Sequence, residues 1–276
     1  MVRENRATTK SADARGLLRW GIAFIGLLAL SGPVRSKGVE GGDELLARTQ
    51  AAVDEFVDKF AYLRYEEDVD QQKLKDNQKV DYSRQTVFDS IMRMHFEEGR
   101  LRVDEQRLEE KLPAHNDGRP LVSTNGFSTL AMIFHPYYAN SFMFTRLPDD
   151  TVNGKLLGRI RFEHIPGKLS PILYQVFNAD RPLELSGTAW VSPSTAEIYR
   201  IEASTFGTLS EMGIKEIRAQ IAYGDVTLRD ETQPQWLPVS ATVDLETPRQ
   251  HWRNIHRFQD YRKYRVAVNL TGSQKQ

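Results

Sequence analysis

The chain has 276 residues, of which 40% are hydrophobic and 27% are charged, and its formal net charge is zero. This content suits one large or two small domains with a real core. The lack of a basic excess argues against nucleic acid as the main partner, because a phosphate backbone selects a basic surface. Cysteine is absent, which excludes disulfides, thiol catalysis, zinc–thiolate sites and a lipid-modified N-terminal cysteine.

Residues 1–36 carry the features of an export signal. They hold six basic and two acidic residues, which leaves 31 basic and 35 acidic residues in the rest of the chain. An apolar run from Trp20 to Leu30 follows the basic flank and precedes small residues, which is the order of a secretory signal. The run is shorter than the roughly 20 apolar residues of a membrane span. We expect either cleavage after Ser31 or an uncleaved anchor, and both place residues 37–276 in the periplasm or outside the cell.

The next segment predicts an amphipathic helix over about residues 43–60. Asp43 is a suitable N-cap, and Glu44 supplies the negative charge favoured at a helix N-terminus. Apolar residues recur every three or four positions, at Leu45, Leu46, Thr49, Val53, Phe56, Val57 and Phe60. Such a stripe indicates a helix that packs on a sheet, in preference to one that lies on a membrane surface.

A two-residue rhythm then replaces the helical one. Leu63, Tyr65 and Val69 fall on one side of a strand-like segment, and Glu67 interrupts that side. The polar stretch at residues 71–84 lacks a rhythm, so we expect an exposed loop there.

A hairpin and a helix follow in the middle of the chain. Residues 87–108 predict a β-hairpin that turns near Glu98 and Gly99. Residues 127–138 are the strongest mid-chain helix candidate, with apolar side chains on one face and Pro136 as the stop. Residues 141–147 and 156–165 return to the alternation of strands.

The clearest sheet signal lies in residues 183–204. Alternate residues of "LELSGTAWV" are apolar, "SPSTA" supplies a turn, and "EIYRIEAST" alternates again. This pattern predicts an antiparallel hairpin with one buried and one wet face. Three further strands are expected over residues 216–223, 236–245 and 251–266, and Pro238 indicates an edge strand or a bulge.

These elements predict an α+β fold with one strongly curved antiparallel sheet. About ten strands have mostly local connections, and no β–α–β alternation is present. Because a sheet of this size must curl or close, we expect an unclosed half-barrel whose concave side is covered by the N-terminal helix and the short mid-chain helix. Residues 37–276 show no internal repeat and no linker, and are expected to form a single domain.

Motifs for catalysis and for cofactor or metal binding are missing. The chain has no G-x-S-x-G, no glycine-rich phosphate loop after a strand and no H-E-x-x-H. Its histidines form no ligand pattern; they are His95, His115, His135, His164, His251 and His256. Carboxylates are plentiful, and their distribution is more typical of solvated strand faces than of a glycosidase pair. We therefore predict no enzymatic activity, no cofactor and no metal.

A set of apolar residues in the middle third remains to be explained. They are Phe88, Met92, Met94, Met132, Phe134, Phe142 and Phe144. Core packing explains such a set, and so does a flexible, methionine-bearing lining for an acyl chain. Each buried methylene of a ligand is worth about 0.8 kcal/mol, so half an acyl chain binds usefully without polar contacts. We take these seven residues as candidate ligand-lining positions.

Several motifs resemble those of a family of uncharacterised exported bacterial proteins, found in lineages such as acidobacteria. The motifs are a G-x-x-W-[IV]-x-P strand, a tyrosine-bearing strand, a W-[VL]-P-V strand and a final strand ending in F-x-x-[FY]. Here they are Gly187, Trp190, Val191 and Pro193, then Tyr223, then Trp236 to Val239, then Phe258 and Tyr261. The more distant resemblance, over roughly residues 43–266, is to the LolA/LolB-like lipoprotein carriers. It implies an unclosed curved sheet with a hydrophobic interior for acyl chains, and it carries over no site residue.

The sequence therefore predicts a periplasmic or secreted binding protein for a lipid, a lipoprotein acyl chain or another hydrophobic ligand. It would act as a carrier or a sensor, without an integral membrane domain after signal cleavage. The alternative is a cell-envelope scaffold that has a filled core and binds other envelope proteins. An envelope hydrolase is the weakest of the three hypotheses.

Overall fold

The structure, a computed structural model, describes residues 44–111, 121–176, 179–205, 209 and 213–263. The predicted export segment and the predicted N-cap Asp43 lie outside these residues. Among the described residues, no helix combines the length and the apolar character that a membrane span requires.

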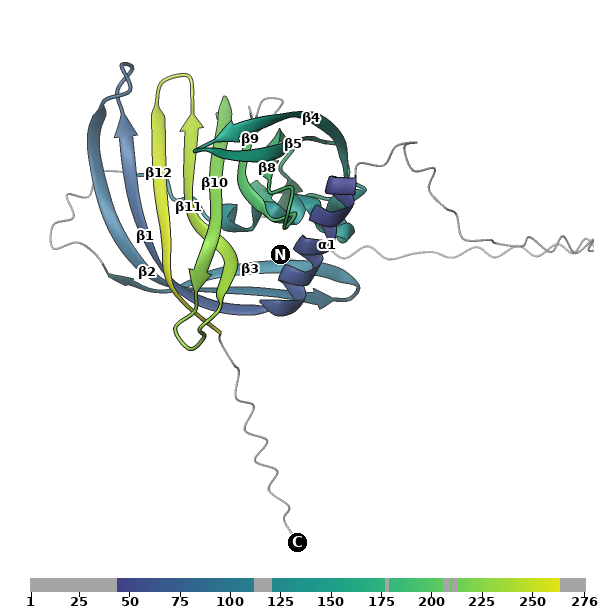
Figure 1. Cartoon of the computed structure of the whole chain (residues 1–276). Helices are drawn as coiled ribbons and strands as arrows, with labels where there is room; N and C mark the ends of the chain where they lie inside the picture. The colour runs from purple at the N-terminus through teal and green to yellow at the C-terminus, as the bar shows by residue number, and fades with distance from the viewer. Residues whose placement is uncertain (1–43, 112–120, 177–178, 206–208, 210–212, 264–276) are drawn as a thin grey trace, which may run out of the picture. The chain divides into compact units, whose positions relative to one another are not determined.

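The described residues form one large sheet, a small two-stranded sheet and three short helices (Figure 1). The large sheet contains β1 (Tyr62–Leu74), β2 (Val80–Glu97), β3 (Arg100–Lys111), β4 (Phe142–Val152), β5 (Lys155–His164), β8 (Leu185–Val191), β9 (Ile198–Thr205), β10 (Glu216–Thr227), β11 (Pro234–Glu246) and β12 (His251–Lys263). The small sheet pairs β6 (Leu173–Val176) with β7 (Ala179–Pro182). The helices are α1 (Glu44–Lys59), the 3₁₀ helix η1 (Phe127–Phe134) and α2 (Pro136–Ala139).

The large sheet is antiparallel throughout and is not closed. Its strand order is β3-β2-β1-β12-β11-β10-β9-β8-β5-β4, so β1 and β12, the first and last of the described strands, are neighbours within it. The sheet curves between its two edge strands, β3 and β4 (Figure 1). The predicted fold class, a curved and unclosed antiparallel sheet of about ten strands, is confirmed.

The N-terminal helix is confirmed by α1. Its apolar stripe lies against the sheet, with Thr49, Val53, Phe56 and Val57 buried. Arg48, on its polar side, donates to the carbonyl oxygens of Pro193 (3.0 Å) and Ser194 (2.7 Å) in the β8–β9 turn. One end of α1 is therefore tied to the end of a hairpin.

The mid-chain helix differs from the single α-helix that the pattern predicts. It is a 3₁₀ helix, η1, followed by the one-turn α2, and His135 separates them in an extended conformation (φ −61°, ψ 136°). Pro136 occupies the first turn of α2, where its missing N–H costs no hydrogen bond. The proline therefore ends one helix and begins the next.

The prediction of an exposed loop at residues 71–84 is wrong. Most of this stretch is strand, because Gln71 pairs with Arg84 and Lys73 pairs with Tyr82 across the β1–β2 hairpin. β1 is also bonded along its other edge to β12. These two ladders satisfy the backbone groups of β1 whatever the polarity of its side chains, and this is why local polarity misled the prediction.

The other turn and bulge predictions are confirmed. Glu98 and Gly99 connect β2 to β3 with φ of 51° and 74°, the signs that a tight two-residue hairpin turn requires at both positions. Pro238 lies at a register shift between β10 and β11. Since β11 is a central strand, the proline marks a bulge and not an edge.

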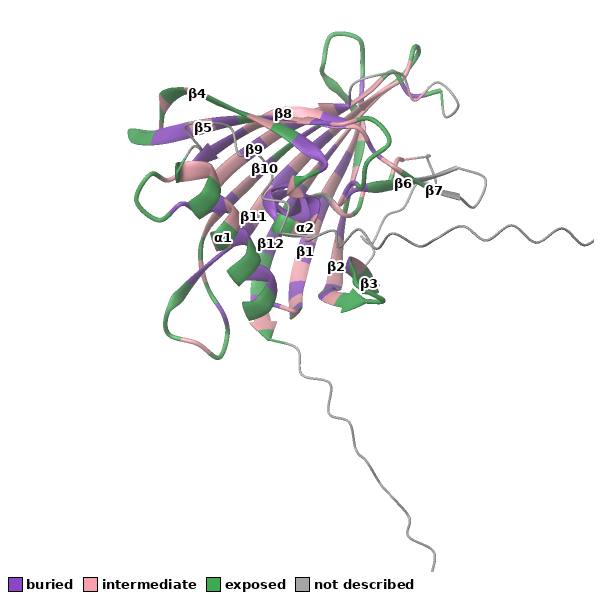
Figure 2. Ribbon diagram, turned by 90° about the vertical axis from the view of Figure 1, so that its right-hand side faces the viewer, coloured by how far each residue is buried: buried purple, intermediate pink, exposed green. Residues whose placement is uncertain are grey.

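The core lies on the concave face of the sheet. Alternate residues of most large-sheet strands are buried there, and α1 and α2 lie over the same face (Figure 2). The most deeply buried residues of the cover are Leu130, Met132, Ile133 and Phe134 of η1, each 0% exposed. The apolar interior is thus a sandwich of sheet and short helices.

Candidate functional site

The interior that the sequence assigns to a ligand is occupied by η1. This helix contacts β9, β10 and β11 of the sheet as well as α1 and α2. It belongs to no β-ladder, and side chains supply its links to the sheet. The interior is therefore covered by elements whose removal would leave the sheet hydrogen bonds intact.

The structure brings most of the seven candidate lining residues into this interior. Met92, Met94, Met132, Phe134 and Phe142 belong to the core and are at most 5% exposed, and Phe144 packs against it. Phe88 lies apart from them on β2, half-buried beneath the guanidinium of Arg107, 4.2 Å from its ring centroid.

Three of the phenylalanines form one aromatic cluster at the β4 end of the interior. The Phe134 ring lies 5.1 Å from that of Phe144 and 6.1 Å from that of Phe162, and Phe142 lies 6.2 Å from Phe162. Sequence reasoning missed Phe162 as a member, although its alternation in β5 already placed it on the buried side. In this conformation the side chains of the six candidates other than Phe88 pack in or against the core, so a ligand would have to displace η1 or α1 to reach them.

Two polar links hold η1 in place. The hydroxyl of Tyr223 in β10 accepts from the N–H of Ala131 (3.0 Å) and donates to the carbonyl of Ser128 (3.2 Å). On the other side, Glu105 of β3 accepts from the N–H of Gly126 (2.9 Å) and from the hydroxyl of Ser128. The N-terminal end of η1 is thus pinned between β3 and β10.

A buried ionic group lies next to this end of η1. Arg107 of β3 donates to both carboxylate oxygens of Glu67 in β1, each at 2.9 Å, and Nδ1 of His256 in β12 lies 2.7 Å from Glu67 Oε1. The side chains of Glu67, Arg107 and His256 are 4%, 16% and 3% exposed. Glu67 is the residue that interrupts the apolar side of the first strand in the sequence, so the interruption was a real signal.

The Glu67 carboxylate is strongly stabilised in its charged form. Burial alone would raise its pKa, but hydrogen bonds from His256 and Arg107, together with the Arg107 charge, outweigh burial and lower the pKa from 4.5 to about 2. The neighbouring Glu105 behaves oppositely, since burial raises its pKa despite the bond from Ser128. Protonation in acid therefore disfavours the folded state at Glu67 and favours it at Glu105.

The ionic group anchors residues 122–126, which we call the strap and which lead into η1. The carbonyl of Val122 accepts from Gln71 and from Asn254, both at 2.9 Å. The carbonyl of Thr124 accepts from Arg107 at 2.9 Å, and its hydroxyl lies 2.9 Å from His256 Nε2. Polar side chains of β1, β3 and β12 thus hold the strap across the concave face.

The order Glu67–His256–Thr124 is that of a carboxylate, an imidazole and a hydroxyl in a nucleophilic triad. The space beside Glu67 and His256 measures only about 10 Å³, whereas small-molecule sites measure roughly 300–1,000 Å³. Asn254 also donates to the same Thr124 oxygen at 2.9 Å. The group has no room for a substrate, and its hydrogen bonds to Thr124 hold the strap in place.

A groove opens at the rim of the sheet beside α1, and we call it the rim groove. It consists of two pockets of about 410 and 200 Å³ that share Thr195, Glu197, Asp225 and Trp236. The larger pocket is also lined by Leu156, Leu157 and Tyr199, and the smaller one by Phe56 and Phe60 of α1.

The wall of the rim groove contacts both elements that cover the interior. Trp236 stacks on Tyr223, with ring centroids 5.0 Å apart, and meets Phe56 of α1 edge-on at 5.3 Å. Tyr223 in turn holds η1 through its hydroxyl. The rim groove therefore borders the contacts of Trp236 with α1 and with Tyr223.

No protein-family model and no curated protein sequence matches the chain. Among solved structures, the chain is similar to a DUF1329 family protein from Desulfovibrio piger, with a TM-score of 0.44 and 12% identity over 86% of this chain and 96% of that chain. It is also similar to an outer membrane lipoprotein-sorting protein domain from Vibrio parahaemolyticus, with a TM-score of 0.34 and 10% identity over 79% and 90%. A third similarity, to the MucA/MucB complex of Pseudomonas aeruginosa, has a TM-score of 0.21 and 7% identity over 80% and 98%.

Proposed function

We propose that this chain is an exported binding protein for a hydrophobic ligand, either a lipid or the acyl chain of a lipoprotein. It acts as a carrier or a sensor and performs no catalysis. The observation that carries the proposal is the composition of the interior, where the apolar face of an unclosed sheet is covered by short helices that share none of its backbone ladders.

The energies of the closed and the ligand-bound states are comparable in this proposal. Displacing η1 exposes its four large buried side chains, Leu130, Met132, Ile133 and Phe134, at about 1.5–3 kcal/mol each, and each methylene of an acyl chain that replaces them gains about 0.8 kcal/mol on burial. The polar links at Tyr223 and Glu105 cost about 0.5–1.5 kcal/mol each when they open to water. An acyl chain of ordinary length offsets that cost.

The rim groove is the proposed entrance. Its larger pocket falls within the range of ligand sites, and Leu156 at its edge is 61% exposed. An acyl chain that enters there contacts Trp236 and Tyr223 first. Displacing them loosens α1 and η1 together, which exposes the candidate lining residues other than Phe88.

A specific observation favours the second candidate, a cell-envelope scaffold with a filled core. Met92, Met132 and Phe134 are each 0% exposed, as core residues without a ligand role would be. In that case the curved sheet only displays its outer surface to protein partners.

Lipid extraction separates these two candidates. The protein is purified from a bacterial envelope fraction, extracted with organic solvent and analysed by mass spectrometry for co-purified lipid, and binding of a fluorescent fatty acid is then titrated. We expect Met132→Gln to weaken fatty-acid binding, while Met143→Gln, at a 55% exposed position of β4, leaves binding unchanged. Protein that is consistently free of lipid and does not respond to the fatty acid supports the scaffold instead.

A further inference from the structure

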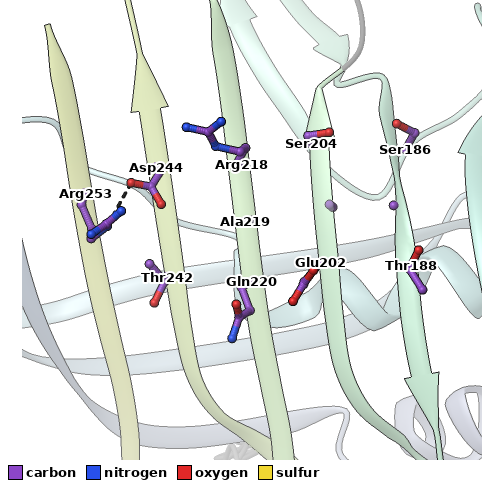
Figure 3. A pocket seen from close by; sticks show the side chains of 12 residues that line it. Ser186, Thr188, Glu202, Ser204, Arg218, Ala219, Gln220, Thr242, Asp244 and Arg253 are labelled. Carbon is purple, nitrogen blue, oxygen red and sulfur yellow. Dashed lines mark hydrogen bonds and ion pairs between the residues drawn. The ribbon is translucent and has the colours of Figure 1, made fainter. Parts of the chain in front are cut away.

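The outward face of the sheet carries a hollow of about 540 Å³, on the opposite side from the apolar interior (Figure 3). Its side chains come from five adjacent strands, β8 to β12, at positions that alternate with core residues. This volume is within the range of small-molecule sites. The hollow is separate from the interior, and nothing said of it depends on the proposed function.

The strand register arranges the lining residues in two rows across the sheet. The first row runs through directly paired residues of neighbouring strands, Ser186, Ser204, Arg218, Asp244 and Arg253. The second row lies two residues along each strand and runs through Thr188, Glu202, Gln220 and Thr242. Every one of these nine side chains is polar.

Size differences within the rows make the hollow. Between the two rows the strands carry Gly187, Ala203 and Ala219, which face the core and expose only backbone to the floor. Short side chains such as Ser204 stand beside long ones such as Arg218. The long side chains form walls around a floor of hydroxyl groups and backbone.

The charges of the wall are balanced, and Asp244 is held in place by two partners. Asp244 is 16% exposed and holds Arg253 Nε at 3.0 Å and His251 Nε2 at 2.8 Å (Figure 3 shows the first of these contacts). Arg218 and Arg253 stand against Glu202 and Asp244, so the lining carries no net charge. Such a surface attracts neither a polyanion nor a polycation.

The hydroxyl groups of the floor form no hydrogen bonds with the described side chains or backbone. Ser186, Thr188, Ser204 and Thr242 make no side-chain hydrogen bond to any residue that the structure describes, and neither does the amide of Gln220. Together they offer donors and acceptors in one hollow, on rigid central strands that fix their spacing.

We propose that this hollow is a binding site for a neutral oligosaccharide. The chemistry of the site matches a ligand that is rich in hydroxyl groups and has no net charge. An apolar ligand would leave the hydroxyl and amide groups without partners, and a strongly charged ligand would face charges of its own sign on one wall.

The test uses isothermal titration calorimetry of the full chain with three probes, chitotetraose, maltotetraose and cellotetraose. We expect at least one probe to bind with a millimolar or tighter Kd. Gln220→Ala should weaken that binding about 2- to 10-fold, the effect of one hydrogen bond, and Ser204→Trp should abolish it by filling the hollow. The control Gln106→Ala removes an exposed glutamine from β3 and should change nothing.

Co-sedimentation with insoluble peptidoglycan sacculi identifies the source of the glycan. Binding to chitotetraose and to sacculi indicates the cell wall, whereas binding to maltotetraose or cellotetraose alone indicates another polysaccharide. The proposal is overturned if none of the three probes binds at millimolar concentration. It is also overturned if Gln220→Ala binds as tightly as the unmodified chain while circular dichroism shows both to be folded.

Discussion

At the scale of single residues, the partners in the buried ion pair of Glu67 and Arg107 could not be predicted from the sequence. The pattern showed that Glu67 interrupts an apolar strand face, which was a sign of a special position. It could not show that Arg107 and His256 complete the group, because they lie 40 and 189 residues away and meet Glu67 only when β1, β3 and β12 come together. Alternation predicts which face a residue takes but not which partners it meets there.

The acid dependence of stability should carry the signature of Glu67. Its pKa is about 2 in the folded protein and near 4.5 in the unfolded chain, so its contribution is complete above about pH 4.5 and is lost as the pH falls toward 2. The size is at most about 3 kcal/mol. Glu67→Gln should lower stability at pH 7, because Arg107 is left buried without its counter-charge.

Urea unfolding at several pH values measures this effect. The pKa of Glu105 is shifted in the opposite direction, so its effect on stability partly masks that of Glu67. The informative quantity is therefore the difference in unfolding free energy between the unmodified chain and Glu67→Gln, which should shrink as the pH falls from 4.5 to 2. The matched control is Glu97→Gln, an exposed position at the end of β2. If the difference in unfolding free energy between the unmodified chain and Glu67→Gln is the same at every pH, the role given to Glu67 is refuted.

Gly187 in β8 allows a second prediction at this scale. A Cβ at this position would lie 2.0 Å from the backbone oxygen of Glu202 and 2.7 Å from the ring of Phe162, and the backbone oxygen has no room to yield. Gly187→Ala should therefore destabilise the protein by about 1–3 kcal/mol or more. At Gly224 in β10 the nearest atom would lie 3.5 Å away, so Gly224→Ala should be nearly neutral. Thermal or urea denaturation compares the two, and equal effects would contradict the argument.

At the scale of elements, strands were easier to predict than the short helices. The hairpin of β8 and β9 and the bulge at Pro238 follow from side-chain period and proline chemistry, which act locally. The nature of η1 does not, because its 3₁₀ form depends on long-range links such as the Tyr223 hydroxyl, 92 residues from Ala131. Six of the seven candidate lining residues lie in or against the core, whereas Phe88 packs under Arg107, and their role as a ligand lining stays a prediction.

The link between Tyr223 and η1 can be weakened without changing the shape of the core. Tyr223→Phe leaves the N–H of Ala131 and the carbonyl of Ser128 without this partner, at a cost of about 1–3 kcal/mol. We expect faster amide hydrogen exchange over residues 128–134 in this variant. Tyr199→Phe, which removes a single 3.3 Å bond from Asn153 at the surface, should leave that exchange unchanged. Unaltered exchange in Tyr223→Phe would mean that the hydroxyl does not hold the helix.

At the scale of the whole molecule, the alternation of the chain predicted one curved antiparallel sheet with an apolar concave face. The alternation could not predict what covers that face, because the same pattern of apolar residues is expected whether a ligand or η1 packs on it. The proposed function therefore requires that η1 and α1 give way to an acyl chain. The two surfaces of the sheet would then serve different ligands, an apolar one inside and a glycan outside.

Photocrosslinking tests this claim most directly. A palmitate analogue with a diazirine at the end of its chain is bound to the protein, irradiated and mapped by peptide mass spectrometry. We expect crosslinks to the interior, at Met92, Met94, Met132 or Phe134, and their loss when excess palmitate competes. Crosslinks confined to exposed residues such as Met143 and Leu156, or none that palmitate displaces, would contradict it.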